Sequence, residues 1–354
     1  MSAWTIVTVV AFSLSAAGAD EFFLSNSVPA IIFKYDAAGV RTEFAREGIY
    51  NPLGVAVDGS GNVYVAHDGS TPGQNSAISK FDPNGKPSVF AEMPGWYPTQ
   101  LAFSPDGDLY VSEGLGPIYR FDKNGHGTLF ANLPNSGGMA FDQSGNLYVT
   151  SNNTIVRFDT SGTPTVVVST GLAGPVGLAF DSRGNLFVSN SQTYTIVKIT
   201  PGGVQSVFAG PSEGLYVPLG LAFDSDDFLY VVNYVGNSIV KLDPEGKARP
   251  FATAGLNRPR FITFRPAQLF GGKIARIGAS QYRISFQGDP GRSYAIQYRT
   301  DLMGEEPWQL LVTRLADSHG HYSTVDQLPP ATPARFYRAV ALDVMSKSSG
   351  AAIR

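Results

Sequence analysis

The sequence of 354 residues predicts an all-β fold, a six-bladed β-propeller with four-stranded blades followed by a small β-sandwich-like domain. Two observations predict the propeller. A unit of about 40 residues recurs five times, and the two ends of the repeat region each hold part of a sixth unit. A third observation, the loss of the repeat after residue 266, predicts the second domain.

The five complete units open with closely similar segments. They read PLGVAVDGSGNVYV from Pro52, PTQLAFSPDGDLYV from Pro98, SGGMAFDQSGNLYV from Ser136, PVGLAFDSRGNLFV from Pro175 and PLGLAFDSDDFLYV from Pro218. Their turn glycines Gly61, Gly107, Gly145 and Gly184 are 46, 38 and 39 residues apart, and Asp227 holds the equivalent place 43 residues later. Self-similarity at this period is typical of propeller blades.

Each unit holds four short apolar runs, which we expect to form four antiparallel strands. In the fourth unit these runs are GLAF, NLFV, TIVKI and SVFA. Asp-x-x-Gly segments join the first run to the second and the third to the fourth. Asp caps such a turn through its side chain, and Gly takes the left-handed conformation that follows. The second run stays apolar on both faces, as expected for a sheet packed between two others.

The two ends of the repeat region complete each other. Pro259–Phe264 (PRFITF) matches a first strand, and Glu21–Ala45 matches a second, third and fourth strand. Together they predict a composite sixth blade. A ring closed in this way leaves no long free sheet edge, which is how propellers avoid edge-to-edge aggregation.

The repeated patterns P-x-G-(L/V)-A-F-D-x-x-G-N-(L/V)-(Y/F)-V and I-x-(K/R)-F-D-x-x-G resemble the NHL-repeat family. They also resemble the broader superfamily of six-bladed propellers that includes the SMP-30/gluconolactonase and streptogramin-lyase types. The resemblance covers residues 21–266. It implies the fold rather than one function, because this fold hosts unrelated activities.

Residues 1–19 are expected to be a signal peptide, with the propeller domain at 20–266. An apolar run from Trp4 to Leu14 precedes Ala17-Gly18-Ala19, a small-x-small cleavage pattern. The alternatives are a misplaced start or a membrane anchor, because no Lys or Arg precedes the apolar run. We therefore expect a secreted protein, periplasmic or extracellular, with no membrane attachment after cleavage.

Residues 267–343 are expected to form the small all-β domain, with a flexible tail at 344–354. The stretches GDPGRSYAIQYRTDL and RFYRAV resemble fibronectin-like domains of secreted bacterial proteins. We expect Tyr294, Trp308 and Phe336 in its core.

Composition narrows the function classes. The net charge is −3 with only 26 Lys and Arg, which argues against a nucleic-acid partner. There is no Cys, so disulfides, thiolate nucleophiles and Cys-ligated metals are excluded. We expect a monomer.

Function is expected on the face built from the variable loops, opposite the uniform Asp-x-x-Gly turns. One polar column ends the second strands: Asn26, His67, Glu113, Ser151, Asn190 and Asn233. We expect it to ring the channel mouth. These side chains would either cap the following turn or bind a ligand, such as a hard divalent cation (Ca²⁺ for example) or a polyhydroxylated molecule.

Three aromatic residues, Tyr50, Trp96 and Tyr216, lie two positions before the first strands. They would either stack on sugars or peptides, or pack between blades. Arg260 replaces an apolar residue in the sixth first strand. It would either bind an anion near the channel or pair with a neighbouring acid.

These features favour a non-enzymatic binding or scaffold propeller for a protein, peptide or carbohydrate, without a cofactor. The alternative is a metal-dependent hydrolase or lyase of the SMP-30 or streptogramin-lyase type, with Glu113 as the catalytic base. The candidate metal ligands in that case are His67, Glu113, Asn190 and Asn233. A third possibility is a structural module without a small ligand. A three-histidine site is excluded, because only His67 and His126 lie in the propeller region. The SMP-30 type places a metal-ligating Glu just before a first-strand Pro, and no Glu stands there: the six residues are Asn51, Tyr97, Asn135, Gly174, Val217 and Arg258.

Overall fold

The computed structural model describes residues 21–265, apart from 37–38, 70–74, 115, 225 and 253, and six strands between 273 and 342. The propeller unit comprises Ala19–Pro266. The predicted signal peptide at 1–19 and the predicted tail at 344–354 lie outside the described residues. Within the described residues, no helix is long and apolar enough to cross a membrane.

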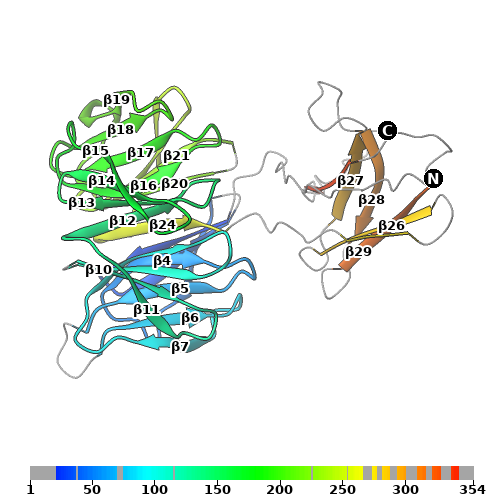
Figure 1. Ribbon diagram of the computed structural model, residues 1–354, viewed down its shortest axis with the longest axis horizontal. Coiled ribbons are helices and arrows are strands. Elements are labelled where there is room, and N and C mark those ends of the chain that lie inside the picture. The colour runs from blue at the N-terminus through cyan, green and yellow to red at the C-terminus, as the bar shows by residue number, and fades with distance from the viewer. Residues whose placement is uncertain are drawn as a thin grey trace, which may run out of the picture. The chain divides into compact units, whose positions relative to one another are not determined.

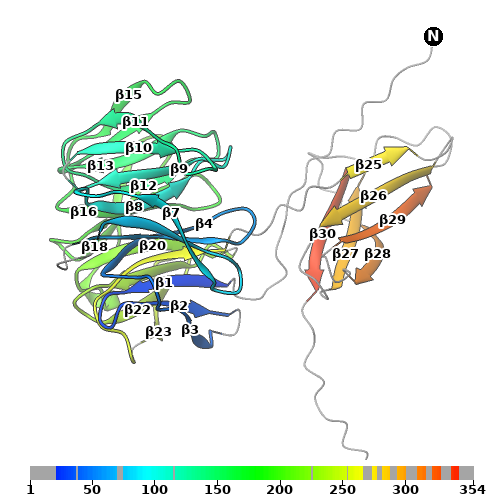
Figure 2. The same ribbon diagram turned by 90° about the horizontal axis from the view of Figure 1, so that it is seen from below.

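The propeller consists of six four-stranded antiparallel sheets, as the sequence predicts. Figures 1 and 2 show these blades from two perpendicular directions. Blade 1 is β24 (Pro259–Phe264), β1 (Phe22–Asn26), β2 (Ile31–Tyr35) and β3 (Arg41–Ala45); blade 2 is β4 (Pro52–Val57), β5 (Val63–His67), β6 (Ala77–Phe81) and β7 (Pro87–Glu92). Blade 3 is β8 (Pro98–Phe103), β9 (Leu109–Glu113), β10 (Pro117–Phe121) and β11 (Gly127–Asn132); blade 4 is β12 (Ser136–Phe141), β13 (Leu147–Ser151), β14 (Thr154–Phe158) and β15 (Pro164–Val168). Blade 5 is β16 (Pro175–Phe180), β17 (Leu186–Asn190), β18 (Thr195–Ile199) and β19 (Gln205–Ala209); blade 6 is β20 (Pro218–Phe223), β21 (Leu229–Asn233), β22 (Ser238–Leu242) and β23 (Ala248–Ala252).

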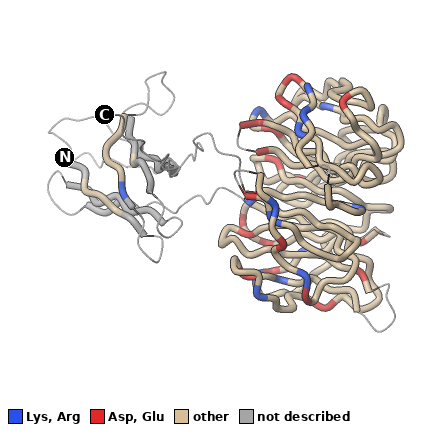
Figure 3. Tube along the Cα trace, turned by 180° about the vertical axis from the view of Figure 1, so that it is seen from behind, with Lys and Arg blue, Asp and Glu red and all other residues tan. Residues whose placement is uncertain are grey.

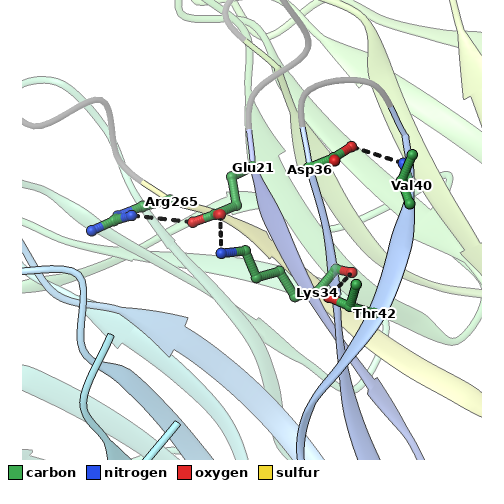
Figure 4. A network of polar contacts seen from close by, with 6 residues as sticks. All are labelled: Glu21, Lys34, Asp36, Val40, Thr42 and Arg265. Carbon is green, nitrogen blue, oxygen red and sulfur yellow. Dashed lines mark hydrogen bonds and ion pairs between the residues drawn. The ribbon is translucent and has the colours of Figure 1, made fainter. Parts of the chain in front are cut away.

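The composite blade is confirmed. Its strand order is β24-β1-β2-β3, with Phe22 opposite Phe264. The N–H of Arg265 donates to the carbonyl of Glu21 at 2.8 Å. The Glu21 carboxylate also pairs with the ammonium of Lys34 and, at 3.2 Å, with Arg265 Nη1 (Figure 4). Strands from the two ends of the repeat region are thus joined by backbone and ionic contacts.

The Asp-x-x-Gly segments form the expected turns. In blade 5, Asp181 Oδ1 accepts the N–H groups of Arg183 (3.0 Å) and Asn185 (2.8 Å), and Oδ2 accepts the Asn185 side-chain amide at 2.7 Å. Gly184 follows with a φ of 77°. The carboxylate thus satisfies most of the turn's own backbone, while the N–H of Ser182 in this turn donates to Asp227 Oδ1 of blade 6 at 2.9 Å.

Aromatic side chains fill the spaces between blades. Each blade has a β-bulge between its third and fourth strands, and the bulged residues are Phe44, Phe90, Phe130, Val167, Phe208 and Phe251. The Phe90 ring of blade 2 contacts Tyr64 of its own blade at 5.0 Å and Phe121 of blade 3 at 6.3 Å. Such edge-to-face and tilted ring contacts add to the stabilisation from apolar burial.

The six first strands line the central channel and approach each other most closely at their third residue. Four of these residues are glycines: Gly54, Gly138, Gly177 and Gly220. A Cβ atom on Gly138 would lie 1.8 Å from the Val176 carbonyl oxygen, and one on Gly177 would lie 2.2 Å from that of Leu219. We call this level the glycine neck. Beyond it, the second halves of the same strands surround a cavity of about 290 Å³.

The second unit contains two three-stranded antiparallel sheets. One has the order β25 (Lys273–Arg276), β26 (Gln281–Gln287), β29 (His321–Gln327), and the other β28 (Gln309–Leu315), β27 (Ser293–Arg299), β30 (Phe336–Leu342). Arg314 of β28 donates to the Ser323 carbonyl of β29 at 3.3 Å. The all-β content agrees with expectation, while the fibronectin-like relationship stays a prediction. The expected core residues Tyr294, Trp308 and Phe336 lie outside the described side chains.

Candidate binding site on the loop face

The two faces of the propeller differ in composition. The turn face carries the Asp-x-x-Gly turns, and the loop face carries the connections between second and third strands and between blades. Figure 3 shows acidic and basic residues concentrated on one side of the propeller unit. On the turn face these charges pair locally, as Lys241 does with Asp224 at 2.9 Å. The loop face instead exposes Tyr50, Tyr97 and Tyr216, with 39%, 40% and 48% of their surface accessible.

The polar column lies at the ends of the second strands, as predicted, and all six side chains are buried. Their exposed fractions lie between 1% for Asn26 and 6% for Glu113. Glu113 Oε1 accepts the N–H of Tyr97 at 3.1 Å. Asn233 Oδ1 accepts the N–H of Tyr216 at 3.0 Å. Both bonds fix the connection that enters the same blade.

The other four members of the column are bonded in related ways. Asn26 Oδ1 accepts the N–H of Asn257 at 2.9 Å, Ser151 Oγ donates to the Pro134 carbonyl at 2.7 Å, Asn190 Oδ1 accepts the N–H of Ala173 at 3.3 Å, and His67 Nε2 lies 3.0 Å from Ser79 Oγ. Buried backbone groups of the connections need such partners. Most of these bonds reach the connection that precedes the blade, whereas the capping alternative named the turn that follows the strand, so capping and ligand binding both stay predictions.

His67 is distinctive within the column. Burial lowers the pKa of its imidazole, and the charge of Asp68 opposes this effect. Among the described residues, Nδ1 has no hydrogen-bond partner. The ring of Tyr50 lies edge-on to it at 5.9 Å.

The four metal candidates belong to different blades. His67 and Asn190 lie in blades 2 and 5, on opposite sides of the ring, and Glu113 and Asn233 lie in blades 3 and 6. Each is bonded to segments of its own blade or of its own connection. The part of the chain that the structure describes contains no group of three or more His, Cys, Asp or Glu residues placed to hold a metal ion.

The aromatic column divides in two. Trp96 stacks on Tyr119 at 4.0 Å and packs against the core between blades 2 and 3. Tyr216 contacts Tyr194 of the preceding blade at 5.1 Å but remains nearly half exposed. Trp96 thus packs within the propeller, whereas Tyr50 and Tyr216 present ring surface to solvent, and ligand contacts of all three stay predictions.

A second set of side chains meets at the channel mouth, and we call it the mouth cluster: Asp68, Tyr97, Tyr234 and Arg260. Asp68 directly follows β5, Tyr97 directly precedes β8, Tyr234 directly follows β21, and Arg260 is the second residue of β24. They come from the four consecutive blades 6, 1, 2 and 3. The strand ends place them on one face, where Arg260 and Tyr234 both act electrostatically on Tyr97.

Hydrogen bonds fix the acidic side of the mouth cluster. Asp68 is 2% exposed, and its Oδ2 accepts the Asn51 side-chain amide at 2.7 Å. Burial raises the pKa of the Tyr97 phenol, and the charge of Asp68 and its hydrogen bond to that phenol raise this pKa further, while Arg260 opposes the rise. The Tyr97 hydroxyl is therefore a protonated donor at neutral pH.

The backbone that leads into the mouth is constrained. In five blades the residue before the first strand has a positive φ, and these residues are Asn51, Asn135, Gly174, Val217 and Arg258. The left-handed conformation costs a non-glycine residue about 1–2 kcal/mol. Val217, at φ 50°, is β-branched and so the least suited to it. Such strain is held in place by the surrounding structure and is found at functional positions more often than elsewhere.

Asp68 and Tyr234 were not singled out by the sequence, and Tyr97 was noted only as a position that lacks Glu. A signal was present one residue beyond the polar column, where the chain has Ser27, Asp68, Gly114, Asn152, Ser191 and Tyr234. These six residues differ in charge and size, whereas the residues around them repeat.

Comparison with known proteins gives the fold alone. No family model matches the chain, and no curated protein matches it in sequence. A chain from a nidogen/laminin complex superposes with a TM-score of 0.61 at 19% identity, covering 71% of this chain and 100% of that one. The chain is a six-bladed β-propeller. A protein of unknown function from Bacteroides caccae (TM-score 0.55, 14% identity, 69% and 98% covered) and a protein described as a candidate gluconolactonase (0.51, 15%, 77% and 90%) share this fold.

Proposed function

We propose that this protein is a secreted, non-enzymatic binding propeller that holds a protein or peptide partner on its loop face. One observation carries the proposal, namely the difference between the two faces. The turn face repeats one type of turn, closed largely by its own Asp carboxylate, whereas the loop face varies from blade to blade and exposes Tyr50, Tyr97 and Tyr216. Exposed tyrosines are the side chains most used as anchors in protein interfaces.

The structural comparison supports a protein partner. One chain of the same fold was solved as part of a nidogen/laminin complex. The few charged groups on the loop face also favour such a surface, because interface centres are depleted in charge and enriched in Tyr.

Secretion is the second part of the proposal. In chain order, the propeller begins with β1 at Phe22, shortly after the expected cleavage pattern that ends at Ala19. N-terminal sequencing of protein from the extracellular or periplasmic fraction should begin after Ala19. Protein that accumulates in the cytosol with Met1 retained would contradict secretion but not loop-face binding.

The binding surface is tested by capture. The full mature chain is immobilised and exposed to envelope and culture proteins of its own organism. Captured proteins are identified by mass spectrometry, and the contact face is mapped by hydrogen exchange. The double variant Tyr50→Ala/Tyr216→Ala should lose most of the captured partner while keeping its melting temperature within a few degrees.

A matched control removes exposed apolar groups elsewhere. Val89 and Leu129 lie on the outer strands β7 and β11 and are 63% and 60% exposed. The variant Val89→Ala/Leu129→Ala should capture the partner as the wild type does. Equal loss in both variants, or exchange protection confined to the turn face, would contradict the proposal.

A further inference from the structure

Arg260 breaks the repeat at the channel mouth. It is the second residue of β24, and the equivalent residues of the other first strands are Leu53, Thr99, Gly137, Val176 and Leu219. None of these five carries a charge. One blade in six therefore places a permanent cation at this level, because the guanidinium stays protonated at all relevant pH values.

Two contacts hold this guanidinium in place. Nε donates to Ser27 Oγ at 2.8 Å. The guanidinium carbon lies 5.3 Å from the centre of the Tyr234 ring, within the range of a cation–π contact. The side chain is half-buried, so it is partly desolvated and restricted in orientation.

Arg260 has no counter-ion within the described part of the chain. Its only hydrogen bond there is the one to Ser27, and it takes part in none of the ion pairs found there. The acid of the mouth cluster, Asp68, is bonded to Asn51 and to Tyr97. The two terminal nitrogens, Nη1 and Nη2, are thus donors without an acceptor among these residues.

We propose that Arg260 binds a carboxylate of the ligand through Nη1 and Nη2, beside the Tyr97 hydroxyl. This inference rests on the proposed function and names the recognised group as a carboxylate of the partner peptide, from an Asp or Glu side chain or the chain terminus. A planar carboxylate matches the paired donors of a guanidinium. One cation with Asp68 nearby suits a monoanion, whereas a phosphate dianion would leave excess negative charge.

The site is tested with small matched probes. N-acetyl-aspartate N-methylamide carries the side-chain carboxylate, and N-acetyl-asparagine N-methylamide is its neutral counterpart. Binding to the full mature chain is followed by NMR titration. We expect saturable binding of the aspartate probe, at least about tenfold weaker binding of the asparagine probe, and a similar tenfold loss of aspartate binding in Arg260→Met.

Two further variants separate the site from general charge and folding effects. Arg258→Met removes an exposed arginine two residues earlier and should bind the aspartate probe as the wild type does. Arg260→Lys keeps the charge but loses the paired donors, so it should bind with intermediate affinity. Thermal melting of each variant establishes that it is folded.

The outcomes distinguish this inference from the proposed function. Glucuronate serves as a second source of a carboxylate. If glucuronate binds through Arg260 and the aspartate probe does not, the carboxylate site stands and the peptide partner is wrong. If neither carboxylate binds, or if Arg260→Met binds both as the wild type does, the inference is overturned, and the Tyr50/Tyr216 capture experiment still decides the proposed function.

Discussion

The turn face and the loop face are built from the same repeat, but their backbone groups are hydrogen bonded in different ways. On the turn face, a carboxylate such as that of Asp181 satisfies the backbone within four residues of itself. On the loop face, Glu113 and Asn233 each bond to a connection 16 or 17 residues away. The bonds of each Asp carboxylate on the turn face thus close largely within one hairpin, although the N–H of Ser182 also donates to Asp227 of the next blade at 2.9 Å. The loop face depends on the assembled blade.

This difference shows where the chain is free to vary. A locally satisfied turn tolerates few changes and makes few demands on its surroundings, so it recurs. Connections held by a buried side chain of the blade can change length and composition while that bond is kept. The loop face can thus collect exposed tyrosines and an arginine without an ion pair, provided that the polar column remains to hold it.

The largest effect is expected at the glycine neck, which both faces share. Gly138→Ala should destabilise the protein by about 3 kcal/mol or more, because the added Cβ would lie 1.8 Å from the Val176 carbonyl oxygen and the strands must separate. Gly59→Ala, in a turn with nothing within 4 Å of the added atom, is the control. Urea unfolding measures both. Similar stabilities for the two variants would mean that the first strands are not in close contact.

A smaller loss is expected on the turn face. Asp181→Ala removes the acceptor of three hydrogen bonds in a buried turn and should cost about 2 kcal/mol. The loss should be confined to blade 5, which hydrogen exchange of the Arg183 and Asn185 amides can detect. Faster exchange of loop-face amides as well would break the distinction between a local and an assembled face.

A pH effect that begins near neutral pH is expected on the loop face. Burial lowers the pKa of His67, so the unfolded chain takes up this proton at a higher pH than the folded chain. Stability should be full above a pH of about 6.5 and fall as the pH drops from there towards the folded pKa. His67→Gln should flatten this slope in urea unfolding at a series of pH values. An unchanged slope in this variant would contradict the prediction.

No effect is expected from divalent cations. A metal bound to the native state would raise the melting temperature by mass action. Ca²⁺, Mn²⁺ and Zn²⁺ should each leave it unchanged under the binding hypothesis. A saturable rise with any of them would favour the metal-dependent alternative, and its loss in Asn190→Ala would locate the ion at the polar column.

The repeat made the fold predictable, because the sequence of every blade contains the same pattern of strands and turns. The composite blade could be read from FFLSNS at the start and PRFITF at the end, since each matches one part of a complete unit. The positions of the six polar-column residues at the ends of the second strands also follow from the repeat. Whether such a side chain reaches solvent or bonds to a connection depends on the neighbouring backbone, which the period does not encode.

The mouth cluster was less accessible to sequence reasoning for a related reason. Asp68, Tyr97, Tyr234 and Arg260 come from four blades and hold different places in the repeat, so no column contains them all. Arg260 was singled out from the sequence because it is charged where the other first strands are neutral, and Asp68 stands out in the same way one residue beyond the polar column. Residues that meet because they differ from the repeat do not recur at a fixed spacing, so no pattern in the sequence identifies them as a group.

The pairing of β1 with β24 also determines when the ring can form. Ser25 and Phe261, which are hydrogen bonded to each other, are 236 residues apart in sequence. During synthesis β1, β2 and β3 of blade 1 emerge early. The strand that completes their sheet, β24, is the last strand of the propeller to be made. Until then, the edge of β1 and the apolar sides of blades 1 and 6 have no partner. The chain must therefore be kept from aggregation until about residue 264 has been made, and a truncation before that point would leave an open stack of blades rather than a smaller ring.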